Sequence, residues 1–184
     1  IEIGRSKITI QNNIFRQTGG ICIGKRINWG SEITVQNNEF NYPKWEGTPC
    51  KFLVLEGSNV KIIGNTFTCL DGLIGSFSSV FQEGSVIAHN TFRNCLIAGN
   101  ASKFIDNTII VNNKDEKQAK GLVRFSFGGY EEVSGNDITI NGTSIHLGIT
   151  SKFVNNKIRV KNFKSQVTIG IWNVGTPINF VGKQ

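Results

Sequence analysis

Ile87-Ala88-His89-Asn90-Thr91-Phe92 is one copy of a six-residue pattern that decides the fold of this chain. The pattern begins with an aliphatic residue or Phe, carries Asn at its fourth position and ends with Phe or Ile. Its third position is always Asn, Gly, His or Asp. Along the 184 residues the pattern occurs seven times, at 10–15, 35–40, 62–67, 87–92, 104–109, 133–138 and 153–158. The chain is therefore built from repeats.

The spacing of the repeats indicates what kind of unit each one is. Successive pattern asparagines are 25, 27, 25, 17, 29 and 20 residues apart. An average near 24 is too short for two helices and their turns, and it suits one coil of a β-solenoid. The repeated asparagines are Asn13, Asn38, Asn65, Asn90, Asn107, Asn136 and Asn156.

The residue types within a repeat explain how one coil would form. Period-two alternation places Ile8 and Ile10, and their equivalents, on the inner face of a strand. The residue before each Asn is of a type that accepts a sharp turn with positive φ. The Asn can then point inward, bond the turn amides and bond the Asn of the next coil, as side-chain ladders do in stacked strands. The Phe or Ile two places later returns to the core.

These features predict an all-β fold, a right-handed single-stranded parallel β-helix of about seven rungs, as one domain spanning 1–184. Connections of variable length separate the strands of a rung, and the longest are expected at 41–51, 76–84 and 112–121. In repeat proteins such insertions tend to gather on one face. Met is absent, and Ile1 already lies in a strand-like run, so we expect a fragment of a longer chain.

Composition limits the classes of partner. The net charge is +7 with a pI near 9.4, which favours acidic partners. No dense Lys/Arg run or nucleic-acid-binding motif is present, so nucleic acid is not expected. No apolar stretch reaches the roughly 20 residues of a membrane helix, so membrane insertion is not expected either.

The four cysteines, Cys22, Cys50, Cys69 and Cys95, form no metal-type pair. They are interpreted as small buried hydrophobes, with a Cys69–Cys95 bridge between adjacent rungs as the alternative.

The repeats resemble those of the pectin-lyase-like superfamily of parallel β-helix proteins over nearly the whole chain. That superfamily includes polysaccharide lyases, glycoside hydrolases, uronan epimerases and bacteriophage tailspikes. The Asn- and Lys-rich style of the repeats is most similar to a phage tail appendage. The resemblance implies a polysaccharide ligand, a homotrimeric assembly and a location on a virion tail or outside the cell. It identifies the scaffold and leaves the chemistry open.

Two kinds of residue are candidates for binding a polymer. Positions three after the repeated Asn include Arg16 and Arg93, and positions four before it include Lys61; both columns should face outward and follow an anionic polymer. Trp45 and Tyr42 lie in a turn-rich insertion, and Trp29 lies one rung earlier. Their rings could cover sugar C–H groups.

No catalytic residue can be assigned from the sequence. Glycosidases need two carboxylates about 5 to 10 Å apart, and no pair stands out. Glu131 and Glu132 are adjacent, and in a strand they would face opposite sides. No metal site or cofactor is expected. We therefore predict recognition of a cell-surface polysaccharide, with a secreted lyase, hydrolase or epimerase and a purely structural shaft as the alternatives.

Overall fold

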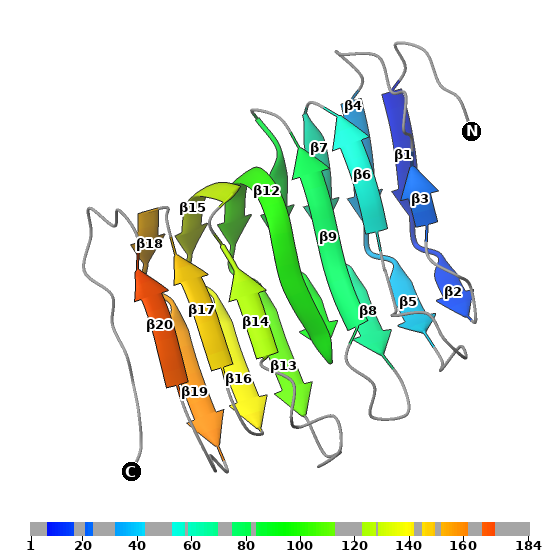
Figure 1. The fold of residues 1–184 in the computed structure, drawn as a ribbon. Helices are drawn as coiled ribbons and strands as arrows, with labels where there is room; N and C mark the ends of the chain where they lie inside the picture. Colours follow the sequence, from blue (N-terminus) through cyan, green and yellow to red (C-terminus); the bar gives the residue numbers. More distant parts are fainter. Residues whose placement is uncertain are drawn as a thin grey trace.

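The computed structural model describes residues 7–16, 21–23, 32–42, 53–57, 59–69, 75–81, 84–112, 123–127, 129–141, 145–149, 152–161 and 167–171. Within these ranges the chain forms strands and turns, and the strands pair in parallel. Successive strands stack side by side from the blue N-terminal end to the red C-terminal end in Figure 1. The predicted all-β parallel solenoid is confirmed.

Each of the seven rungs contributes one strand to each of three faces. The first face contains β1 (Lys7–Gln11), β4 (Glu32–Gln36), β7 (Val60–Ile63), β10 (Val86–Ala88), the end of β12 (Cys95–Ile105), β15 (Gly129–Ser134) and β18 (Lys152–Val154). The second face is a seven-stranded sheet of β2 (Ile14–Arg16), β5 (Glu39–Tyr42), β8 (Thr66–Cys69), β11 (Thr91–Arg93), β13 (Thr108–Asn112), β16 (Asp137–Asn141) and β19 (Lys157–Lys161).

The third face is built in two parts. It begins with β3 (Ile21–Ile23), β6 (Leu53–Gly57), β9 (Gly75–Phe81) and the start of β12. A three-stranded sheet follows, made of β14 (Val123–Ser126), β17 (Ile145–Ile149) and β20 (Val167–Ile171). The expected loop at 76–84 is wrong for its first part, because residues 75–81 are strand β9, paired with β12 and β6.

β12 is the longest described strand because it belongs to two rungs. Its first part pairs with β9 on the third face, and its last residues pair with β10 on the first face. The interval of 17 residues between Asn90 and Asn107 is the shortest in the chain. The strand therefore passes directly from one face to the next where other rungs insert a connection.

The turn between the first and second faces has the same geometry in all seven rungs. The residue before the repeated Asn has a φ between +52° and +68° at Asn12, Asn37, Gly64, His89, Asp106, Gly135 and Asn155. This left-handed conformation is tolerated by Gly, Asn and Asp, which explains the residue types at that position. At Gly64 an added Cβ would lie 2.6 Å from Asn37 Oδ1, so this rung has a second, steric reason for glycine.

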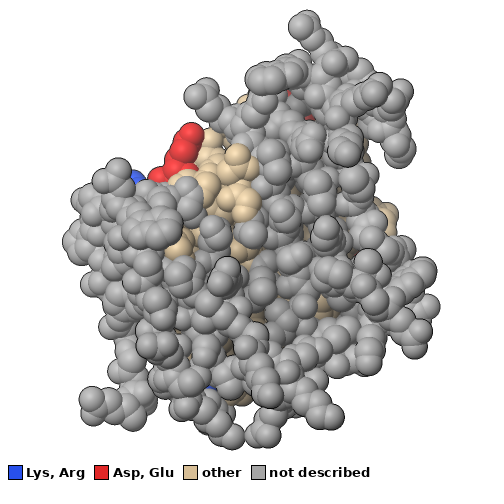
Figure 2. All heavy atoms as spheres, viewed as in Figure 1, with Lys and Arg blue, Asp and Glu red and all other residues tan. Residues whose placement is uncertain are grey.

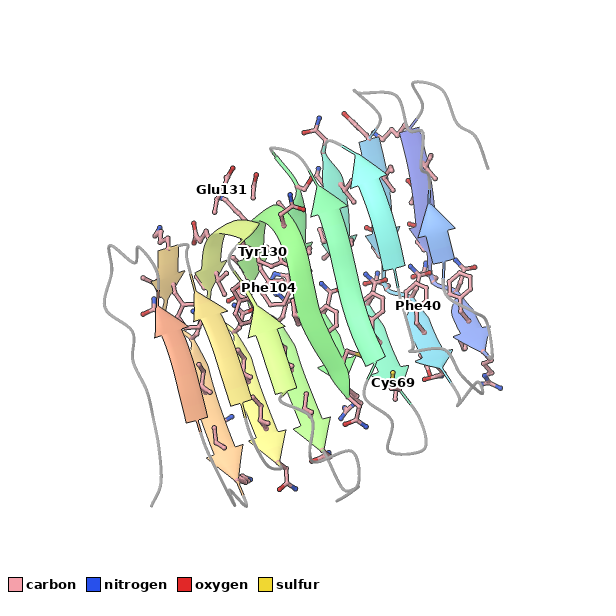
Figure 3. The ribbon with its side chains drawn as sticks, in the orientation of Figure 1. Phe40, Cys69, Phe104, Tyr130 and Glu131 are labelled. Atoms are coloured by element: carbon pink, nitrogen blue, oxygen red, sulfur yellow. The ribbon has the colours of Figure 1, made fainter. Side chains whose placement is uncertain are left out.

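The core lies between the three faces and changes its composition along the axis. Phe15, Phe40, Phe67 and Phe92 stack in a column, with ring centroids 4.8, 4.8 and 5.1 Å apart. The column continues with the buried Ile109, Ile138 and Ile158. There the aromatic volume comes instead from Phe104, Phe127, Tyr130 and Phe153, of which Figure 3 labels Phe104 and Tyr130 between the layers.

Candidate functional site

The repeated asparagines form a ladder that fixes the turn beside the second face. Asn65 donates from its backbone amide and from Nδ2 to Oδ1 of Asn90, at 2.8 and 3.1 Å. Its Nδ2 also contacts the carbonyl of Ile63 in its own rung and that of Val35 in the rung before. The same arrangement repeats from Asn13 to Asn156.

Burial shows that this ladder is a structural feature. Asn38, Asn65, Asn90, Asn107, Asn136 and Asn156 are at most 4% exposed, and only Asn13, at the first rung, is exposed. Each inner amide group satisfies backbone groups that would otherwise be buried without a partner. The ladder therefore holds the strands of successive rungs in register, and its own polar atoms are not available to a ligand.

The outward side of the second face presents two residue columns in strict register. One column runs from Ile14 through Glu39, Thr66, Thr91, Thr108 and Asp137 to Lys157. The other runs from Arg16 through Asn41, Thr68, Arg93, Ile110 and Thr139 to Arg159. Rungs lie about 4.8 Å apart, so these groups repeat at that interval along the axis.

The sequence did not point to the three threonines of the first of these columns. Thr66, Thr91 and Thr108 lie on consecutive rungs, and all three are partly exposed. Their hydroxyls can donate and accept hydrogen bonds. The signal was present in the triplets Asn65-Thr66-Phe67 and Asn90-Thr91-Phe92, whose middle position the repeat pattern leaves free. A row of hydroxyls along a sheet suits a polyhydroxylated ligand.

The arginines of the second face differ in their availability. Arg16 and Arg93 are exposed, three rungs or roughly 14 Å apart. Among the residues that the structure describes, no carboxylate pairs with either one. Arg159, by contrast, donates to both carboxylate oxygens of Asp137 and to the Thr139 hydroxyl. Arg93, at the centre of the sheet, is therefore the cation best placed for an anionic ligand.

Lys61 lies on a different sheet from Arg16 and Arg93. It belongs to an outward column of the first face that continues through Val86, Lys103 and Glu132 to Lys152. Glu132 lies between Lys103 and Lys152 in this column, and Lys152 pairs with it at 3.6 Å. The structure thus places the two predicted basic columns on two faces that meet at the Asn turn.

Glu132 is the carboxylate whose ionisation the fold perturbs. A hydrogen bond from the Ser134 hydroxyl, together with the charges of Lys152 and Lys103, lowers the pKa of Glu132. Glu131 is exposed, and Figure 3 shows it pointing away from the solenoid. In the same view, Figure 2 shows acidic atoms at the surface in that region.

Glu131 and Glu132 are both accessible to solvent, the first exposed and the second partly exposed. Tyr130 and Val133 are the residues of β15 that enter the core. The inward alternation shifts between them, where the paired strand β12 also carries two consecutive buried residues, Ala101 and Ser102.

The structure does not test the prediction for the three candidate aromatic residues. Trp29 and Trp45 lie outside the described residues, and Tyr42 is described only as the last backbone position of β5. Cys69 and Cys95 are buried and neither forms a disulfide, so the alternative bridge between them is not formed. Cys22 lies in β3 with its side chain outside the description, and Cys50 lies outside it altogether.

Within the described residues, no helix is long and apolar enough to span a membrane. In the same ranges no group of three or more His, Cys, Asp or Glu side chains is arranged to hold a metal ion.

The second face, an in-register array of threonine hydroxyls around Arg93, is the candidate binding surface. Comparison with protein-family models, curated proteins and solved structures found no match to this chain.

Proposed function

We propose that the second face binds an extended anionic polysaccharide of a cell surface, with the polymer lying along the solenoid axis. The observation that carries this proposal is the in-register array of Thr66, Thr91, Thr108 and Arg93 on one sheet. Regular hydroxyls suit the hydroxyls of successive sugars, and the exposed Arg93 guanidinium suits an acidic substituent. The net charge of +7 would steer such a polymer toward the protein.

The biological setting belongs to the same proposal and rests on the resemblance of the repeats. We place the chain in a tailspike-like appendage or a secreted β-helical protein of the pectin-lyase-like type. The location is then a virion tail or the extracellular space, and the assembly is a homotrimer. Sedimentation velocity tests the trimer, and a monomer at micromolar concentration contradicts it.

The test is binding of bacterial capsular and cell-wall polysaccharides to the chain and to the double variant Arg16→Ala with Arg93→Ala. Loss of two phosphate- or carboxylate-binding cations from the second face should weaken binding about tenfold or more and flatten its dependence on salt. The charge-matched control is Lys61→Ala with Lys103→Ala, which removes the same charge from the first face. It should retain most of the affinity.

The outcomes separate this function from its two alternatives. Equal loss in both double variants would assign the effect to net charge and remove the second face from the proposal. Shortened or unsaturated sugars released by the unaltered chain would show an enzyme instead. Failure to bind any acidic surface polymer would favour a shaft that only spaces other parts of a longer protein.

A further inference from the structure

At the first rung the described core residues are less covered than in the later rungs. Ile8, Ile10 and Phe15 point inward but are only partly buried. Their equivalents one rung later, Ile33 and Val35, are 0% exposed, and Phe40 is 4% exposed.

The hydrogen bonds at this end are incomplete in a specific way. In each later rung the residue after the ladder Asn donates its amide to the ladder carbonyl of the rung before, as Glu39 does to Asn13 at 2.9 Å. In each later rung the ladder Oδ1 also accepts from the preceding Asn. Among the described residues, the Ile14 amide has no such acceptor and Asn13 Oδ1 has no such donor.

We propose that the N-terminal end of the solenoid is a docking surface for one further β-solenoid rung of the same repeat, carried by a polypeptide segment outside these 184 residues. The docked rung offers an Asn carbonyl to the Ile14 amide. It donates an Asn backbone amide and side-chain amide to Asn13 Oδ1. It also places a Phe or Ile against the face of Phe15 opposite Phe40, which no other described ring stacks on. Docking there would form the same hydrogen bonds and apolar contacts as the six rung-to-rung interfaces already present. It does not depend on the proposed glycan function.

The polarity of the ladder determines which side of the partner docks. On its C-terminal side, Asn13 offers its carbonyl oxygen, its backbone amide and its Nδ2 to rung two. On the N-terminal side, the Ile14 amide and Asn13 Oδ1 need the same three groups from the Asn of a partner rung. The partner must therefore present the C-terminal side of a rung. A second copy of the chain does not offer that side openly, because Phe153 and Ile158 of the last rung are 1% and 5% exposed.

The experiment extends the full chain at its N-terminus with a duplicate of residues 32–57, the segment that contains β4, β5 and β6. Covalent linkage gives the duplicate rung a high effective concentration at the docking surface. The control extension carries Leu and Asp in the duplicate at the positions equivalent to Asn38 and Phe40. Hydrogen exchange of the Ile14 amide is the measurement, because that amide gains an acceptor only if a rung docks.

The Ile14 amide should exchange at least tenfold more slowly in the extended chain than in the parent chain, and the control extension should not slow it. Equal exchange in the extended and parent chains, or equal protection by the control extension, would overturn the proposal. Protection of the parent chain that rises with protein concentration would also overturn it, because the occupant would then be a second copy.

Discussion

At the scale of single residues, the fold depends on what an asparagine side chain can do at a left-handed turn. Its amide combines one acceptor oxygen with two N–H donors, and the ladder uses both. At Asn90, Oδ1 accepts from Asn65 while Nδ2 donates to the carbonyls of Ile62 and Ala88. An Asp at this position would lack the donors, and a Gln would be one methylene too long for the same contacts.

Asn90→Leu should lower the free energy of unfolding by on the order of 1–3 kcal/mol or more, because several buried polar groups lose their partner at once. Urea unfolding followed by circular dichroism measures the loss. Asn13→Leu is the matched control, since Asn13 is exposed at the end of the ladder, and it should change stability by no more than roughly 0.5 kcal/mol. Equal effects of the two substitutions would mean that the inner ladder contributes no net stability.

At the scale of strands, the sequence predicts the first two faces well and the third face poorly. β7 and β8 flank the Asn turn within a fixed motif, so alternation and turn residues define them together. β9 contains Gly75 and three serines, a composition typical of loops, and it becomes a strand because β12 and β6 pair with it on both sides. Tertiary pairing of this kind overrides local propensity and cannot be inferred from the segment itself.

In the candidate site too, some features can be predicted from the local sequence and others cannot. The outward position of Arg16 and Arg93 follows from their fixed distance to the repeated Asn. The ion pair that neutralises Arg159 does not follow from that distance. It forms because Asp137 of the preceding rung lies in the adjacent column. Outward columns are thus predictable from the repeat, whereas the ion pairs across them depend on which residues the register brings together.

The pairing of β15 with β18 predicts a pH dependence of stability. The pKa of Glu132 is lowered in the folded chain, first by the Ser134 hydroxyl and then by Lys152. A lowered folded pKa stabilises the protein above the unfolded pKa, about 4.3 for glutamate, and this stabilisation is lost as the pH falls through the folded value.

Glu132→Gln should therefore be less stable than the parent chain at pH 7, and the difference should shrink as the pH is lowered into the acid range. Unfolding curves at a series of pH values measure it. Glu131→Gln, at the exposed neighbouring position, controls for the change of net charge. A Glu132→Gln difference that stays constant from pH 7 to pH 3 would contradict the assignment.

At the scale of the whole molecule, the solenoid behaves as a one-dimensional stack in which each rung contacts only its neighbours. Stability in such a protein is close to a sum of rung and interface contributions. A ligand lying along the second face would cross several interfaces at once, so binding and cohesion of the stack are coupled. The less covered first rung and the covered last rung make the two ends of this stack unequal.

This inequality gives a prediction for the phenylalanine column. Phe67 is 0% exposed between Phe40 and Phe92, so Phe67→Ala opens a cavity in the middle of the stack and should cost about 3–5 kcal/mol. Phe15 stacks only on Phe40 within the described residues and is partly exposed, so Phe15→Ala should cost roughly 1–2 kcal/mol.

Hydrogen exchange shows which strands each substitution destabilises. Phe15→Ala should speed exchange in β1 and β2 and leave β11 and β13 unchanged, because only the end rung loses packing. Phe67→Ala should speed exchange in rungs on both sides of β8, because both neighbours lose a stacking partner. If Phe15→Ala destabilised β13 as much as β2, the rungs would unfold as one cooperative unit, and the description of the protein as a stack of nearest-neighbour interfaces would be wrong.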